Sequence, residues 1–168
     1  MKIYIGSDHA GFELKNKLVA FLEGGNKYEV IDLGPHHYDK QDDYPELIAP
    51  VAQAVSLDKN AKGIIIGGSG QGEAIVANRF KGIRAVVFYG TGEQLNLLNS
   101  SKKEEDSEII KLSRAHNDAN ILSLGARFLD DNEAKEAVQL WLETPFSGEE
   151  RHKRRIAKID SKLKKCKM

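Results

Sequence analysis

Hydrophobic and polar residues alternate along this chain in a way that predicts a repeated strand and helix pattern. Short runs rich in β-branched residues predict strands at residues 3–6, 29–33, 63–66, 84–88 and 121–124. Apolar residues at helical spacing predict helices at residues 11–22, 44–57, 74–80, 93–98 and 132–142. This alternation is typical of a parallel sheet that is covered by helices on both faces.

Length and composition favour one domain with its own core. The chain has 168 residues, of which 40% are hydrophobic. Lys plus Arg and Asp plus Glu both number 25, so no net charge draws the chain to nucleic acid or to a membrane. Basic residues dominate after Glu149. We therefore expect a single α/β domain at residues 1–150 and a basic helical tail at residues 151–168.

The chain starts directly in a strand pattern, without the apolar stretch of a signal peptide, and none of its apolar runs approaches membrane-spanning length. Its single cysteine, Cys166, has no intrachain partner for a disulfide. We expect a cytoplasmic protein without membrane association, disulfides or a cysteine metal cluster.

The segment after the third predicted strand carries the clearest chemical signal. Glycine occupies positions 67, 68, 70 and 72, and Glu73 follows. Glycines let the backbone approach a ligand, and free N–H groups at a helix start attract negative charge. The dinucleotide fingerprint fails because Glu73 occupies its third glycine position, and the P-loop fails because no Gly-Lys-Ser or Gly-Lys-Thr follows.

Two interpretations of Glu73 remain open from the loop alone. A carboxylate beside such amides can act as a base on an anion that the amides stabilise. Alternatively, Glu73 is a first-turn residue favoured by the helix dipole. The dipole lowers the pKa of Glu73 and burial raises it, and the sequence does not decide between them.

Ligands of open parallel sheets bind beyond the carboxyl ends of the strands. That edge gathers Ser7, Asp8 and His9 with the 67–73 loop and the segment after Phe88. A histidine and an acid there can move protons. The alternative is that Asp8 caps the next helix and His9 is merely exposed.

The segment between Gly34 and Pro50 is rich in histidine and acid, but its spacing matches no compact ligand motif, so we expect a polar loop and no metal. Tyr44 is placed to reach across the strand ends. Residues 90–113 are predicted to form an exposed loop or a frayed helix without assigned chemistry.

Further candidates lie in the second half of the chain. His116 and Asn117 can serve as an acid and a hydrogen-bond donor before the fifth strand, and Arg127 follows that strand. Arg151 and Arg155 share one face of a helix, and paired guanidinium groups suit a phosphate. For residues 162–167 we favour a solvated tail over a nucleic-acid arm.

Six blocks follow one another from Met1 to about Ile156. They are Gly6-Ser7-Asp8-His9-Ala10-Gly11-Phe12; Asp43-Tyr44-Pro45; Gly67-Gly68-Ser69-Gly70-Gln71-Gly72-Glu73; Ala77-Asn78-Arg79 with Lys81-Gly82-Ile83-Arg84-Ala85; Arg114-Ala115-His116-Asn117-Asp118-Ala119-Asn120; and Arg151-His152-Lys153-Arg154-Arg155. Together they resemble the ribose-5-phosphate isomerase type B family, which also includes galactose-6-phosphate and allose-6-phosphate isomerases.

The resemblance implies a three-layer α/β/α Rossmann-like fold with a five-stranded parallel sheet and a basic C-terminal helix. It also implies a homodimer or tetramer with active sites shared between subunits, and no metal or organic cofactor. The implied reaction interconverts ribose 5-phosphate and ribulose 5-phosphate through a cis-enediolate, in the pentose phosphate pathway. One branch uses a cysteine base where this chain has Gly67, so the chain resembles the branch with a glutamate base.

By resemblance, Glu73 removes the proton, and His116 opens the sugar ring with help from Asp8. Ser69 and the loop backbone hold the enediolate, and Asn117 binds the sugar. His9, Arg127, Arg151 and Arg155 contact the phosphate, some of them from the partner subunit. The full expected binding set is Asp8, His9, Tyr44, Gly68, Ser69, Gly70, Gln71, Gly72, Asn117, Arg127, Arg151 and Arg155.

Two alternatives accompany this hypothesis. The substrate could be another sugar phosphate, such as galactose 6-phosphate, allose 6-phosphate or a four-carbon sugar phosphate. From a different class, the chain could be a non-catalytic phosphate-binding module with a nucleic-acid tail, although the acid/base set of Asp8, Glu73 and His116 argues against it.

Overall fold

The sheet has the predicted parallel architecture. A computed structural model describes residues 1–90 and 102–163. Five strands pair in the order β2-β1-β3-β5-β4, and every pair is parallel. The strands are β1 (Lys2–Ser7), β2 (Glu29–Asp32), β3 (Lys62–Gly67), β4 (Ala85–Phe88) and β5 (Ile121–Gly125). The expectation of a five-stranded parallel sheet is therefore confirmed.

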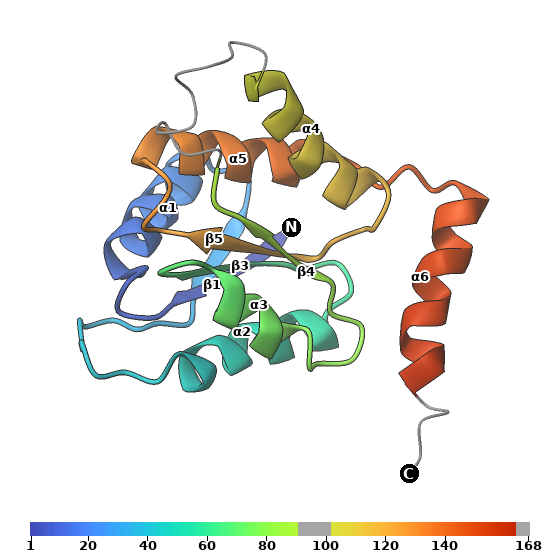
Figure 1. Cartoon of the computed structure of the whole chain (residues 1–168). Helices are drawn as coiled ribbons and strands as arrows, with labels where there is room; N and C mark the ends of the chain where they lie inside the picture. The colour runs from blue at the N-terminus through green and yellow to red at the C-terminus, as the bar shows by residue number, and fades with distance from the viewer. Residues whose placement is uncertain (91–101, 164–168) are drawn as a thin grey trace.

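Helices cover both faces of this sheet. They are α1 (Phe12–Gly24), α2 (Tyr44–Leu57), α3 (Gln71–Ala77), α4 (Lys102–Ala115), α5 (Asp131–Glu143) and α6 (Glu150–Leu163). Figure 1 shows α1, α4 and α5 on one face and α2 and α3 on the other, while α6 stands beside the three layers. Among the residues that the structure describes, no helix has both the length and the apolar character needed to cross a membrane.

The central strand β3 contributes to two hydrophobic cores. Ile64 and Ile66 pack with the core under α1 and α5, and Ile65 packs with the core under α2. Successive side chains on a strand point to opposite faces, which explains why a continuous apolar run suits a strand covered on both sides. All three isoleucines are fully buried, and each such burial stabilises the fold by about 1.5–3 kcal/mol.

Two predictions for helical segments differ from the structure by more than two residues. Helix α3 begins at Gln71 rather than at residue 74, because the loop turns at Gly70. Helix α4 spans part of the stretch that was predicted as an exposed loop or frayed helix. Its C-terminal part is fixed by the buried Ile110 and by Arg114, which pairs with Asp118 at 2.8 Å. The predicted helix at residues 93–98 lies outside the described residues.

The turn between β1 and α1 lies directly against the end of β3. A Cβ atom on Gly11 would lie 2.5 Å from the carbonyl oxygen of Ile66. Contact with backbone cannot be relieved by a rotamer change, so only glycine allows α1 to start at this distance from the sheet. This close approach also fixes the position of Asp8, which precedes the turn.

We expect Gly11→Ala to lower the free energy of unfolding by about 1–3 kcal/mol, the usual cost of overpacking. Gly24→Ala, at the other end of α1, is the matched control, because a Cβ atom there meets nothing within 4 Å. This control should raise stability by about 0.5–1 kcal/mol, since alanine is the better helix former. Urea unfolding measures both values, and equal effects would contradict the packing argument.

Candidate active site

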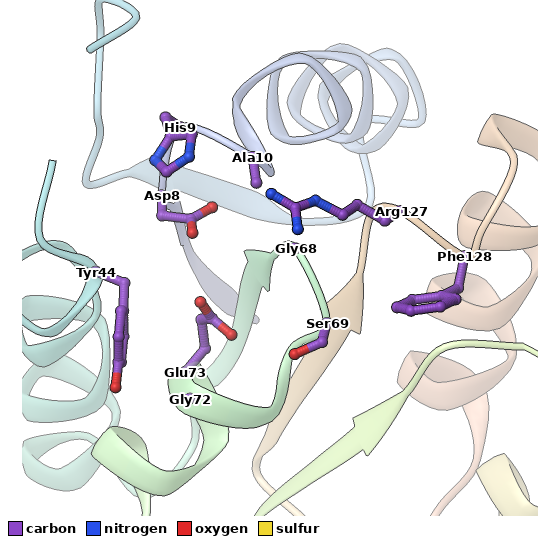
Figure 2. A pocket seen from close by; sticks show the side chains of 10 residues that line it. All are labelled: Asp8, His9, Ala10, Tyr44, Gly68, Ser69, Gly72, Glu73, Arg127 and Phe128. Atoms are coloured by element: carbon purple, nitrogen blue, oxygen red, sulfur yellow. The ribbon is translucent and has the colours of Figure 1, made fainter. Parts of the chain in front are cut away.

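A pocket of about 290 Å³ lies at the carboxyl ends of the strands. It depends on the pairing of β1 with β3, in which Ser7 lies opposite Ile66 and the N–H of Asp8 donates to the Ile66 carbonyl at 3.1 Å. Figure 2 shows the residues that line it: Asp8, His9, Ala10, Tyr44, Gly68, Ser69, Gly72, Glu73, Arg127 and Phe128. The sheet edge that the sequence indicated is therefore the place where these residues meet.

The glycines of the 67–73 loop make room for side chains of the site. A Cβ atom on Gly67 would collide with the carboxyl group of Glu73. One on Gly68 would lie 3.2 Å from the Arg127 guanidinium carbon, and one on Gly72 would lie 2.9 Å from the ring of Tyr44. From the sequence, these glycines were expected to let a ligand approach the backbone. In the structure they also leave room for three polar side chains.

The loop backbone also offers donors to the pocket. Gly70 has a φ of +74°, a conformation that favours glycine, and its carbonyl accepts a 2.6 Å hydrogen bond from Ser123 Oγ. In the described part of the chain, the N–H groups of Ser69 and Gly72 make no hydrogen bond. Both residues line the pocket, so their amides can stabilise negative charge on a ligand. Gly70, the N-cap of α3, and Gln71, its first residue, do not line the pocket.

Glu73 is buried at the pocket floor, with 4% of its surface exposed. Burial raises the pKa of its carboxyl group above the ordinary value, because the charged form loses hydration. A hydrogen bond from its own backbone opposes that increase, and the negative charge of Asp8 adds to it. The sequence left open whether the helix dipole lowers the pKa of Glu73 more than burial raises it. In the structure burial dominates, and the pKa is raised.

Asp8 is the second buried acid of the site, and burial is also the main cause of its raised pKa. Its Oδ1 accepts a 3.0 Å hydrogen bond from the N–H of Gly11. Asp8 therefore stabilises the turn before α1, although the N-cap of that helix is Gly11 and no side chain caps it, and Asp8 also lines the pocket beside Glu73. Two acids with raised pKa values in one cleft are typical of a site that moves protons.

Two side chains at the other end of the pocket can carry positive charge. In Figure 2, Arg127 extends across Gly68 toward Asp8 and His9. His9 Nδ1 lies 2.6 Å from Asp42 Oδ1, and this hydrogen bond is the largest cause of a raised pKa for His9. The sequence did not reveal this partner, and it also missed Ala10 and Phe128 in the pocket lining.

Three side chains of this region carry atoms that could bind a metal ion. Ligand atoms of Asp8, His9 and Asp42 lie within 4.8 Å of one another. However, Asp8 Oδ1 is used by Gly11 and His9 Nδ1 by Asp42. These atoms therefore have partners within the protein, whereas the buried Asp42 Oδ2 has none among the described residues.

Three of the remaining predicted residues, His116, Asn117 and Arg155, belong to a second pocket of about 300 Å³. It is lined by His116, Asn117, His152, Arg155, Ile156 and Ile159. The rings of His116 and His152 are stacked, with centroids 4.3 Å apart. Sequence reasoning missed His152, which is buried beneath His116.

The turn that carries His116 and Asn117 is held by Arg84. Its Nε donates to the carbonyl oxygens of Asn117 and Asp118, at 2.9 Å each. Its Nη2 donates to Asp118 Oδ2 at 2.9 Å. One guanidinium group thus fixes the backbone conformation beside both pocket residues.

The two pockets lie at opposite edges of the sheet in one chain. His116 precedes β5 and Arg127 follows it, so the five residues of β5 separate them by about 16 Å of strand rise. Figure 1 shows α6 on the side away from the carboxyl ends of the strands. A single chain therefore does not bring His116, Asn117 or Arg155 to Glu73. Arg151 is exposed and donates to Glu149 at 2.7 Å.

We expect Glu73→Gln to make the protein more stable than the wild type at alkaline pH. A carboxyl group with a raised pKa in the folded state destabilises the fold as pH rises through that pKa. The neutral amide removes this cost, so the advantage should shrink toward acidic pH, where the wild-type carboxyl is protonated. Thermal unfolding across the pH range measures the difference, and a gain that grows on acidification would contradict the burial argument.

Comparisons with known proteins identify the family of this chain. The family model for Ribose/Galactose Isomerase matches residues 3–93 and 103–159. The chain is 37% identical to ribose-5-phosphate isomerase B of Mycolicibacterium paratuberculosis, over 93% of this chain and 87% of that protein. It is 39% identical to the probable ribose-5-phosphate isomerase B of Mycoplasma pneumoniae, over 94% and 91%.

Solved structures show the same fold. Ribose-5-phosphate isomerase B of Mycoplasma genitalium, with bound ribulose-5-phosphate, superposes with a TM-score of 0.83 at 34% identity, covering 97% of this chain and 96% of that one. The Clostridium thermocellum enzyme gives a TM-score of 0.83 at 41% identity, covering 98% and 99%. The parallel sheet, the matched family and these relatives together establish that the chain belongs to the ribose/galactose isomerase family.

Proposed function

We propose that this chain is an aldose–ketose isomerase that interconverts ribose 5-phosphate and ribulose 5-phosphate. The observation that carries the proposal is the buried Glu73 carboxyl group, which lines a pocket beside free loop amides. His9 and Arg127 supply positive charge at the other end of that pocket. The names of the relatives support ribose 5-phosphate as the substrate.

Glu73 acts as the base on the open-chain sugar. Its carboxylate takes the proton from C2, and the electron pair left behind forms the C1–C2 double bond while charge moves onto O1. Removal of such a weakly acidic proton requires stabilisation of the developing oxyanion, which the N–H groups of Ser69 and Gly72 supply. Protonation of C1 by Glu73, with a hydroxyl proton passing from O2 to O1, completes the ketose.

The raised pKa of Glu73 favours this role. A general base works best when its pKa lies close to the working pH, because it then combines basicity with a substantial ionised fraction. Burial increases the basicity of Glu73, and Asp8 strengthens that effect while both groups are charged. The phosphate lies toward His9 and Arg127, so that the far end of the sugar is fixed while C2 lies at the carboxylate.

The complete site is formed by two copies of the chain. One copy supplies the pocket of Asp8, His9 and Glu73, and the other supplies His116, Asn117 and Arg155 from its second pocket. These pockets lie at opposite edges of one sheet, so they cannot close on one small sugar within a chain. In this arrangement His116 is the proton donor for ring opening, and Arg155 adds a guanidinium group to the phosphate end.

We expect the purified protein to convert ribose 5-phosphate in deuterated water into ribulose 5-phosphate that carries deuterium at C1. Glu73→Gln should lower kcat by about 10²–10⁴-fold, the usual contribution of a positioned base, with KM changed only a few-fold. Proton NMR follows the deuterium, and a coupled assay follows turnover.

Glu150→Gln is the matched control, because it makes the same change on an exposed residue outside both pockets. Unimpaired turnover in Glu73→Gln would contradict the assignment of the base. Testing six-carbon and four-carbon aldose phosphates in the same assay compares the alternative substrates, and a higher kcat/KM for any of them would replace ribose 5-phosphate in the proposal.

A mixing experiment tests the shared site. In a hybrid of Glu73→Gln and His116→Ala chains, one site carries both changes and the other carries neither. We therefore expect about half of the wild-type activity from purified hybrids, far above either parent. Co-expression with two affinity tags yields the hybrids.

A hybrid of Glu73→Gln with Asp8→Asn is the control, because both changes lie in the same pocket and every site retains one of them. Recovery of activity in that control, or no recovery in the first hybrid, would contradict the division of the site between two chains.

The expected cytoplasmic location and the absence of a metal or organic cofactor stay predictions.

A further inference from the structure

The loop between β2 and α2 carries an acid to the anion end of the candidate site. It is anchored at its start, where Asp32 accepts hydrogen bonds from Lys15 Nζ at 2.5 Å and from the N–H of Gly34 at 2.9 Å. The Gly34 carbonyl in turn accepts from the N–H of Ser7 at 3.1 Å. The same loop brings Asp42 Oδ1 to 2.6 Å from His9 Nδ1.

Burial makes Asp42 and His9 depend on each other. Only 10% of the Asp42 side chain is exposed, and within the described residues its buried Oδ2 atom has no hydrogen-bond partner. A shielded carboxylate is costly unless a positive charge lies beside it. His9 is the group that Asp42 contacts, so the pair favours a protonated imidazole.

The contact also fixes which nitrogen of His9 is available to a ligand. Nδ1 donates to Asp42, which leaves Nε2 as the free donor of the ring. The edge of the Tyr38 ring packs against the imidazole, with centroids 6.3 Å apart. His9 lines the pocket together with Arg127, so an imidazolium and a guanidinium face the same space.

Several charged groups surround His9, and their effects differ in sign. The hydrogen bond to Asp42 is the largest cause of the raised pKa, and the charges of Asp42 and Asp8 act in the same direction. Burial and the positive charge of Arg127 act against it. Because Asp42 is the dominant cause, the charge of His9 depends on this one carboxylate.

We propose that Asp42 is a positioning residue that holds His9 as a cation, with Nε2 directed to the phosphate of the substrate opposite Arg127. This inference rests on the proposed isomerase function and assigns a role to a residue that does not line the pocket. His9 and Arg127 together form a phosphate clamp. The clamp carries two positive charges against a phosphate dianion, and charge-assisted hydrogen bonds of this kind are the strong ones. The positive charge of His9 is lost as pH rises through the pKa of its imidazole. Without Asp42 this pKa is lower, so the charge is lost at lower pH.

Asp42→Asn tests the proposal because it keeps the shape of the side chain and removes its charge. We expect KM for ribose 5-phosphate near neutral pH to rise about tenfold, the effect of weakening one charge-assisted hydrogen bond, while kcat stays within about threefold. The alkaline limb of the kcat/KM profile should move to lower pH. Asp43→Asn is the matched control, since this exposed neighbour makes no side-chain capping bond, and its profile should match the wild type.

A second measurement separates this inference from the isomerase proposal. In the wild type, NMR titration of His9 should give a pKa above the ordinary value of histidine, and inorganic phosphate should bind more weakly as His9 loses its proton. These effects without turnover of any sugar phosphate would sink the isomerase proposal and leave the clamp. Turnover combined with a His9 pKa that is ordinary or lower, or an Asp42→Asn profile that matches the control, would overturn the clamp.

Discussion

The pairing of β1 with β3 is the interaction on which the candidate site depends. It aligns Ser7 with Ile66, so that the chain leaves both strands side by side and carries Asp8 next to the glycine loop. Ile3 and Ile5 of β1 pack with Ile64 and Ile66 of β3 in one core, and the hydrogen bond from the N–H of Asp8 to the Ile66 carbonyl fixes the end of this pair. The same packing that builds the core therefore positions the two acids.

The electrostatics of the pocket follow from this placement. Asp8 and Glu73 lose hydration together, and burial raises the pKa of each. Arg127 and His9 lie in the same pocket, where they offset the negative charge and suit an anionic ligand. The cleft thus holds two acids with raised pKa values and two basic side chains, an arrangement that suits the proposed phosphorylated substrate.

Sequence reasoning predicted the parts of this arrangement that depend on local pattern. The β-branched runs predicted the strands, and the rule for parallel sheets gathered Asp8 with Glu73. It did not find the contact of His9 with Asp42, because residues 33 positions apart meet only through the path of a loop. The sign of the Glu73 pKa shift depends on burial, which composition does not give. One available signal was overlooked: His116 precedes β5 and Arg127 follows it, and this order already assigns them to opposite sheet edges.

The volume beside Gly67 is filled by the acid of a residue on the next helix. Substitutions at positions 67 and 73 are therefore not independent, because any larger residue at 67 would displace the carboxyl group of Glu73. Under the proposed mechanism, a lineage with a bulkier side chain at 67 must obtain its proton acceptor from that side chain, which is what the resemblance implies for the branch with a cysteine base at this position. We thus expect the two positions to covary in evolution, as alternative solutions to filling one small space.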